Sequence, residues 1–414
     1  MAQNFLSENK IKLIFILTFF TIGFCVEFAY RKPLFDNSVK IAESVQEPFS
    51  KSITFWKYWA YFGVGEFVLA AIIFLFFPIS YCFTFFANMI ITVHLCNYAK
   101  LIYSQGRPYL LDDTVYKACE AGYGNPSGHS FQFTANLLAF AQMFIDLFKL
   151  KKIYSIIIYV ICGILILSIN FSRIVLGVHS INQVIFGDTL GFTVYFIICQ
   201  IIKPHNIELK KFFEVFLTMK FHIIHVIAFI INMVSIVIGG IVNDKMESEE
   251  YEKLKEKIKE ICGSAENAML SRDSITKALY ITAYYGMICG MTLLIYFVKN
   301  RYHQNYNELN YYYRNSKYKW YATYTTRLLF IAICYIPFLS IYSKKGVNIY
   351  LIYVIGSAFP MFVFGFMLFS INYILTIEFN LANRQLYSFK IKRGKTSMDY
   401  ILGDNEEEEE KEIE

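Results

Sequence analysis

The chain has 414 residues, of which 56% are hydrophobic, 18% aromatic and only 17% charged, and its mean hydropathy is +0.40. Because soluble domains carry about 25% charged residues, this composition excludes an ordinary soluble enzyme, a disordered chain and a collagen-like chain. The formal net charge of +6 comes without a basic stripe, so we expect no nucleic-acid partner. The sequence therefore predicts a protein that sits in a membrane and contacts membrane lipids.

Ten apolar runs follow one another along the chain, each long enough to cross a bilayer as a helix. We therefore predict an all-α, polytopic membrane protein with about ten transmembrane helices. The least distinct boundary is at Pro78, where the pattern fits either a hairpin or a kinked helix, although the combined length needs two crossings. The runs cover residues 11–30, 59–78, 79–98, 130–148, 153–171, 181–202, 222–243, 275–298, 327–343 and 348–376.

The loops between the runs predict an orientation. Alternate crossings place more basic residues on the side of the N-terminus, once those of the motifs below and of the mixed-charge loop 244–274 are set aside. Since basic loops stay in the cytosol, we expect cytosolic termini. The loop 244–274 has the apolar spacing of an amphipathic surface helix, and the acidic tail 377–414 is typical of a solvated, disordered end.

Strongly polar residues recur in three blocks at the non-cytosolic ends of spans. These are residues 100–108 (KLIYSQGRP), 126–129 (PSGH) and 172–179 (SRIVLGVH). A lone basic residue at a span end is usually a headgroup anchor, and a lone interfacial histidine is usually a satisfied polar side chain. The topology, however, gathers all three blocks at one membrane surface, and such convergence is what an active site requires.

Two histidines among three cations at a helix start suit a tetrahedral phosphate. Arginine donors match its oxygens in pairs, lysine adds a point charge, and the Ser127-Gly128 turn can direct backbone N–H groups at the same anion. One imidazole can then attack phosphorus while a second protonates the leaving oxygen, so that hydrolysis passes through a phosphohistidine. This chemistry requires no metal and no cofactor, and the nine cysteines form no CxxC pair that would hold zinc.

The three blocks resemble the signature of the type 2 phosphatidic acid phosphatase superfamily, KxxxxxxRP, PSGH and SRxxxxxHxxxD. The resemblance implies a six-helix core and a phosphoric monoester hydrolase. It also implies His179 as the nucleophile and His129 as the general acid. The phosphate-binding residues that it implies are Lys100, Arg107, Ser127, Gly128 and Arg173. With this core, we divide the chain into a phosphatase core (1–202), additional membrane spans (203–376) and the tail (377–414).

The chain departs from the signature at Gln183, where the superfamily usually places an aspartate one helical turn after the nucleophile. A glutamine can orient an imidazole through its carbonyl oxygen, but it cannot stabilise an imidazolium by charge. In this detail the chain is similar to glucose-6-phosphatases, and its run CEAGYGNPSGH from Cys119 to His129 resembles their CExGxGxPSGH. Tyr109 after Arg107-Pro108 also matches that branch.

The resulting expectation is a membrane-embedded, glucose-6-phosphatase-like phosphomonoesterase of the endoplasmic reticulum, with a luminal active site and a phosphorylated small molecule or lipid as substrate. Two alternatives remain open. One is a lipid phosphate phosphatase, acting on phosphatidate or a sphingoid phosphate. The other is a catalytically silent transporter or scaffold of the same fold, in which loss of the nucleophile or of the phosphate ligands would be expected.

Overall fold

The computed structural model describes residues 2–49, 53–62, 65–112, 120, 122–207, 209–245, 249–262, 270–301, 329 and 358–378. Every regular element in these ranges is a helix. Seven helices among them are long and apolar enough to cross a membrane: Asn9–Gln46, Ile79–Leu111, Gly128–Phe148, Lys152–Val175, Ile181–Asn206, Met219–Gly239 and Ser274–Phe297. The prediction of an all-α, polytopic membrane protein is confirmed.

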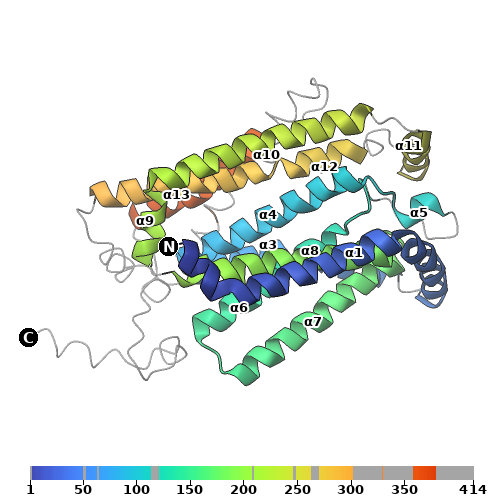
Figure 1. Ribbon diagram of the computed structural model, residues 1–414, viewed down its shortest axis with the longest axis horizontal. Coiled ribbons are helices and arrows are strands. Elements are labelled where there is room, and N and C mark those ends of the chain that lie inside the picture. Colours follow the sequence, from blue (N-terminus) through green and yellow to red (C-terminus); the bar gives the residue numbers. More distant parts are fainter. Residues whose placement is uncertain are drawn as a thin grey trace, which may run out of the picture.

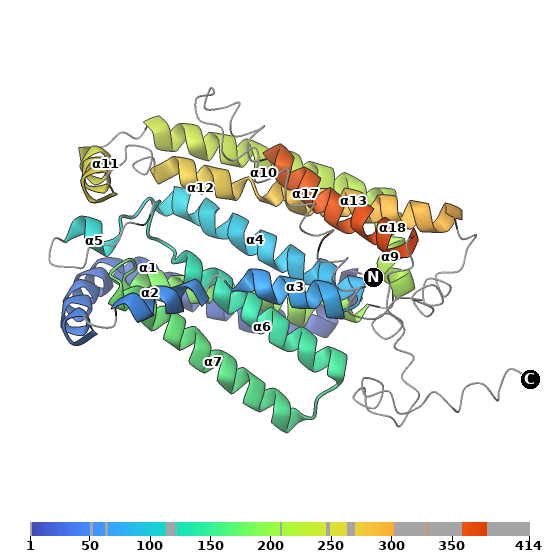
Figure 2. The same cartoon turned by 180° about the vertical axis from the view of Figure 1, so that it is seen from behind.

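The helices run along one bundle (Figures 1 and 2). The predicted core contains α1 (Ala2–Phe49), α2 (Ile53–Phe62), α3 (Glu66–Phe76), α4 (Ile79–Tyr103), α5 (Pro108–Leu111), α6 (Gly128–Phe148), α7 (Lys152–Val175) and α8 (Ile181–Tyr195). A π-helical segment, Phe196–Ile202, continues α8, and a short 3-10 turn, Pro204–Asn206, follows it. The remaining helices are α9 (Leu209–Phe216), α10 (Met219–Lys245), α11 (Glu249–Cys262), α12 (Leu270–Ala278), α13 (Ile281–Arg301), α17 (Phe359–Phe369) and α18 (Ile371–Glu378).

Helix α4 lies in the middle of the bundle, where 78% of its apolar window is buried. It packs against α3 and α6 on one side and against α10, α12 and α13 on the other (Figures 1 and 2). Its Phe83 ring lies 5.1 Å from that of Phe216 and 5.6 Å from that of Phe369. The two predicted membrane parts thus share one hydrophobic core, and the boundary at residue 202 stays a prediction.

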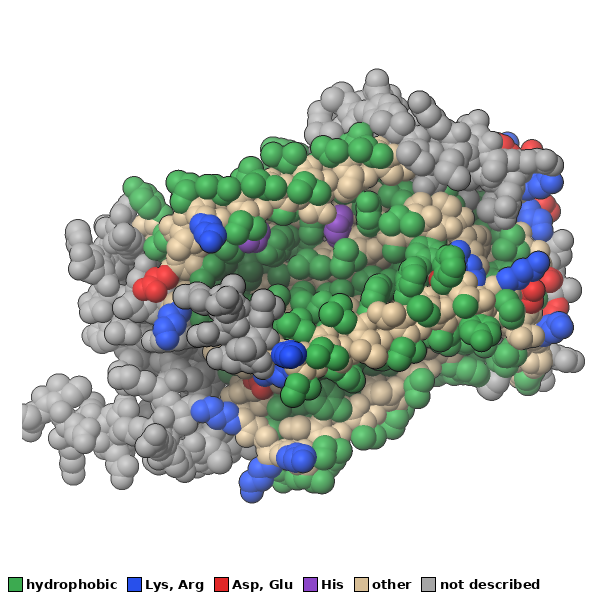
Figure 3. Space-filling model, in the orientation of Figure 1, with side chains coloured by type: hydrophobic (Ala, Val, Ile, Leu, Met, Phe, Trp, Pro, Cys, Tyr) green, Lys and Arg blue, Asp and Glu red, His purple; other side chains and the backbone are tan. Residues whose placement is uncertain are grey.

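The outer helices expose apolar side chains along their length. Only 17% of the apolar window of α7 and 6% of that of α10 are buried, and Ile164 and Ile231 are 62% and 63% exposed. Hydrophobic side chains cover the middle of the bundle, whereas the charged side chains that the structure describes gather at its two ends (Figure 3). This is the surface that a lipid bilayer requires, since hydrocarbon solvates the middle and water the ends.

Two predicted spans differ in the structure. Helix α1 continues beyond residue 30 through most of the predicted loop 31–58, because Gln46 donates to the Val175 carbonyl and Ser38 accepts from the Ile181 N–H, both at 2.9 Å. The stretch predicted as one span at 59–78 is not one regular helix, because its described residues are divided between the end of α2 and α3. The chain then turns back at Pro78, which places the Phe74 ring beside that of Phe86.

Part of the prediction lies outside the described residues. This holds for the span at 327–343 apart from residue 329, for the first half of the span at 348–376, and for the tail beyond residue 378. The amphipathic helix predicted at 244–274 corresponds to α11, whose Ile258 is fully buried.

Candidate active site

Four helix ends meet at one end of the bundle and bring the three polar blocks together. Helix α4 ends shortly after Lys100, and α7 ends after Arg173, whereas α6 begins at Gly128 and α8 begins just after His179. Because α6 and α8 present their N-termini there, the positive ends of their dipoles point toward the same space. The site therefore combines buried cations with helix N-termini.

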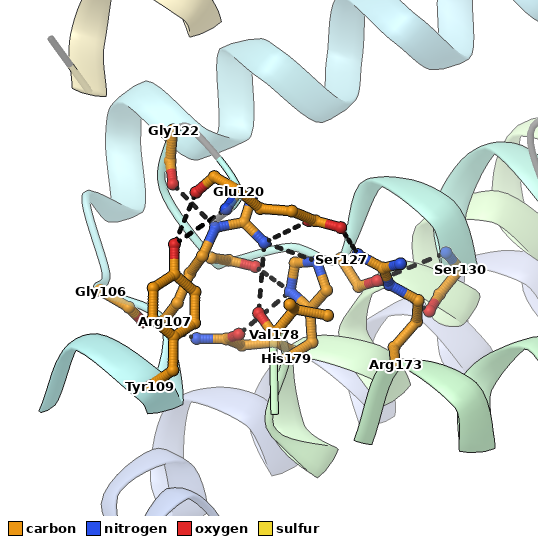
Figure 4. A network of polar contacts seen from close by, with 12 residues as sticks. Gly106, Arg107, Tyr109, Glu120, Gly122, Ser127, Ser130, Arg173, Val178 and His179 are labelled. Atoms are coloured by element: carbon orange, nitrogen blue, oxygen red, sulfur yellow. Dashed lines mark hydrogen bonds and ion pairs between the residues drawn. The ribbon is translucent and has the colours of Figure 1, made fainter. Parts of the chain in front are cut away.

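A single carboxylate joins the two arginines of the site (Figure 4). Nη1 of Arg107 donates to Oε2 of Glu120 at 2.9 Å, and Nη2 of Arg173 donates to Oε1 of the same carboxylate. Arg107 is also held by the carbonyls of Gly122, at 3.0 Å from its Nε, and Val178, at 3.2 Å from its Nη1. These contacts hold the guanidinium groups in a fixed orientation. The side chains of Arg107 and Arg173 are 4% and 2% exposed, whereas that of Glu120 is 32% exposed.

The hydrogen bonds of His179 define its tautomer. Nδ1 faces two acceptors, the Gly124 carbonyl at 2.9 Å and Oε1 of Gln183 at 3.2 Å, so it carries the proton. Nε2 faces a donor, Nη1 of Arg107, at 3.2 Å, so it carries the lone pair. The imidazole consequently points its basic nitrogen at the Arg107 guanidinium.

Gln183 supports this arrangement from a fully buried position. Its Oε1 also accepts from the Ser180 N–H at 3.3 Å, which completes the N-terminal cap of α8, and its Nε2 donates to the Gly106 carbonyl at 3.0 Å. A Cβ at Gly124 would come within 2.7 Å of the Gln183 amide, so only glycine lets the chain approach so closely. Gln183 and Gly124 therefore both accept from Nδ1 of His179, whereas the sequence pointed to Gln183 alone, and the orienting role stays a prediction.

The remaining predicted site residues lie around the same group of Arg107, Arg173 and His179, which we call the phosphate cradle. The charges of Arg107, Arg173 and Lys100 all act on both imidazoles. His129 makes no hydrogen bond within the described part of the chain, and its side chain is partly exposed. Nζ of the buried Lys100 lies 3.9 Å from the position that a Cβ on Gly128 would occupy.

Ser127, predicted as a phosphate ligand, also caps the N-terminus of α6. Its Oγ accepts from the Ser130 hydroxyl at 2.9 Å and from the Ser130 N–H at 3.4 Å as the N-cap of α6, and its own N–H donates to the Gln183 carbonyl at 2.9 Å. The Ser127 N–H is therefore committed to the protein, whereas the hydroxyl proton can still be donated to an oxyanion. Its role as a phosphate ligand, like those of the other site residues, stays a prediction.

The electrostatics of the site favour a neutral imidazole beside an ionised carboxylate. Burial, together with the charges of Arg107 and Arg173, lowers the pKa of His179 well below its usual range. For Glu120, burial acts to raise the pKa, but the charges of Arg173 and Arg107 outweigh it and hold that pKa well below the usual range. At physiological pH His179 can therefore act as a nucleophile without first losing a proton.

Some residues that shape the site escaped the sequence-based prediction. The buried Glu27 of α1 pairs with Arg31 at 2.8 Å and accepts from Asn125 at 2.8 Å, so it anchors the residue that precedes the second block. Its signal was an acidic residue inside an apolar run, since ionisable groups in a span are usually functional. The carbonyl of Gly124 left no signal, because every residue carries one. Asp188 of α8 accepts from Thr134 of α6 and from Asn170 of α7, so its carboxylate joins three helices of the bundle.

Part of the chain that contains this site is similar to known proteins. Residues 77–207 match the family model described as PAP2 superfamily, a range that contains all eight predicted site residues. Phosphatidylglycerophosphatase B from Bacillus subtilis (strain 168) is 26% identical over 93 residues, which are 22% of this chain and 44% of that protein. The match therefore spans less than half the length of this relative. No solved structure matches the chain.

Proposed function

We propose that the chain is a membrane phosphatase that hydrolyses a phosphate monoester through a phosphohistidine on His179. The observation that carries this proposal is the arrangement at His179. Its Nε2 lone pair faces the buried Arg107, which Glu120 joins to Arg173, while its Nδ1–H group donates to the Gly124 carbonyl on the opposite side of the ring. The match of residues 77–207 to the PAP2 superfamily supports it.

The reaction proceeds in two displacements. The phosphate binds Arg107, Arg173 and Lys100, and its negative charge favours the protonated form of His129. Nε2 of His179 attacks phosphorus while the His129 imidazolium donates its proton to the departing alkoxide oxygen, which leaves as an alcohol. Water then attacks the phosphohistidine and gives a proton to the now neutral His129. This releases inorganic phosphate, frees Nε2 of His179 and restores the imidazolium of His129. The cations stabilise the charge that spreads over the phosphoryl oxygens in both steps.

The substrate belongs to one of two classes. A lipid phosphate is supported by the similarity to a phosphatidylglycerophosphatase. A sugar phosphate such as glucose 6-phosphate is supported by the glucose-6-phosphatase-like run before the second block, because its Glu120 and Gly124 contact Arg107 and His179 directly. In either case we propose that the site opens to the lumen of the endoplasmic reticulum, with cytosolic termini.

The test is an assay of the purified chain against a panel of lipid and sugar phosphates, with His179→Ala beside the unmodified protein. The panel identifies the substrate class, and the variant should lose all turnover because no covalent intermediate can form. Acid-labile labelling of the unmodified protein by a phosphate-labelled substrate, absent from the variant, would report the phosphohistidine. Ordinary turnover by His179→Ala would disprove the assignment.

A further inference from the structure

The Glu120 carboxylate occupies the place between the two arginines where the mechanism puts phosphate. Each of its oxygens takes one guanidinium, Oε2 from Arg107 and Oε1 from Arg173, as two oxygens of a phosphate group would (Figure 4). Two buried guanidinium groups without a counter-charge would repel each other and pay a desolvation cost. An anion between them is therefore required when no substrate is bound.

The cradle has donors that this carboxylate leaves unused. Nε of Arg173 is buried and has no hydrogen-bond partner within the described part of the chain. A phosphate group offers more acceptor oxygens than a carboxylate, so it can satisfy this donor together with those that Glu120 now takes. The arrangement thus fits an anion with more oxygens than the one it holds.

Only the side chain of Glu120 would have to move. Its backbone is anchored, because the Tyr109 hydroxyl donates to its carbonyl at 2.7 Å and its N–H donates to the same hydroxyl at 3.2 Å. The side chain is 32% exposed, against 4% and 2% for the arginines. The Glu120 side chain is therefore the most solvent-accessible of the three and has room to turn toward water.

We infer that Glu120 is the resident counter-anion of the phosphate cradle, and that the phosphate group of the substrate displaces it from Arg107 and Arg173. The inference rests on the proposed function. Displacement sets the affinity of the site, because every incoming phosphate must first break two ion pairs. The returning carboxylate also competes with inorganic phosphate, which speeds the release of product.

The experiment measures vanadate and inorganic phosphate binding to the purified full-length chain and to Glu120→Gln and Glu120→Ala. Glu214→Gln serves as the matched control, because Glu214 is an exposed carboxylate on α9, at the other end of the bundle (Figure 1). Both Glu120 variants should bind either anion about tenfold more tightly or better, with a lower KM and no rise in kcat. The control should bind as the unmodified chain does.

If Glu120 merely held the arginines in place, its removal would weaken anion binding instead of strengthening it. Unchanged or weaker anion binding by a folded Glu120 variant would overturn the inference, as would failure of both variants to fold, since Glu120 would then be an ion-pair partner that phosphate cannot replace. If the unmodified chain neither hydrolyses phosphate esters nor binds vanadate, the proposed function itself fails. Vanadate binding by the unmodified chain without tighter binding by the variants would overturn the displacement alone.

Discussion

At His179, the hydrogen bonds of one ring nitrogen decide what the other can do. The Gly124 carbonyl and the Gln183 side chain both accept a hydrogen bond from the Nδ1–H group, so the lone pair is kept at Nε2. Neither acceptor carries a full charge. A carboxylate at position 183 would place a negative charge beside Nδ1, and a charged acceptor raises the pKa of the imidazole more than a neutral one does.

Gln183→Glu should move the acid limb of the pH profile of kcat/KM to higher pH. In the unmodified chain the pKa of His179 lies well below its usual range, so the imidazole stays neutral into mildly acidic solution. A carboxylate beside Nδ1 favours the protonated ring and raises that pKa, so less of the enzyme can attack at a given low pH. The measurement is kcat/KM from about pH 4 to pH 8, a range that brackets the ordinary pKa of histidine.

Gln183→Leu is the uncharged comparison. It removes the acceptor and leaves the Gly106 carbonyl unpaired, which costs about 1–3 kcal/mol of stability. We expect kcat/KM to fall at every pH while the acid limb stays in place. An acid limb that moves equally in both variants would show that altered packing, and not the carboxylate, shifts the pKa. Full activity of the leucine variant would show that the Gly124 carbonyl alone orients His179.

At the scale of the helices, the site depends on how closely α8 approaches α6. A Cβ at Gly187 would lie 2.8 Å from the Ser127 carbonyl and 3.1 Å from Cβ of Ser130. Ser127 is the N-cap of α6 and Ser130 lies in its first turn, so the two residues flank His129. The separation of α6 and α8 therefore sets the separation of the two imidazoles.

Gly187→Ala should lower kcat at least tenfold, because the methyl group pushes the two helix N-termini apart. A displacement of about 1 Å between reacting groups is enough to cause such a loss. The variant should also lose about 1–3 kcal/mol of stability through overpacking. Gly163→Ala is the matched control, since a Cβ at that position in α7 meets nothing within 4 Å. Its activity and thermal stability should equal or exceed those of the unmodified chain. Equal activity of both variants would contradict a close-contact role for Gly187.

The helices also show why the sequence predicts some features and not others. The spans and the three polar blocks carry signals of their own, namely apolar length and side-chain chemistry at fixed spacing, so the sequence alone placed His129 and His179 at the same end of the bundle. The continuation of α1 depends on its contacts with Val175 and Ile181, which are tertiary and leave no local pattern. The bridge through Glu120 likewise needs two arginines that only folding brings together.

On the scale of the whole molecule, helix α11 lies at the end of the bundle that holds the site (Figures 1 and 2). It contacts α5, and its buried Ile258 belongs to the same cluster as Tyr109 and Leu110. The turn between α6 and α7 lies at the opposite end, where Lys151 precedes α7. If the bundle spans a membrane along its length, α11 shares the compartment of the site and Lys151 faces the other compartment.

Two single-cysteine reporters test this arrangement in a chain whose native cysteines have been replaced. Lys151 and Glu256 are both exposed, at the α6–α7 turn and on α11 respectively, so each tolerates the change to cysteine without disturbing the core. In sealed microsomes, an impermeant maleimide should label Lys151→Cys at once, because basic residues favour the cytosolic side. It should label Glu256→Cys only after the membrane is permeabilised. Labelling of both reporters in sealed vesicles would contradict a bundle that spans the membrane lengthwise, whereas the reverse pattern would place the site on the cytosolic side.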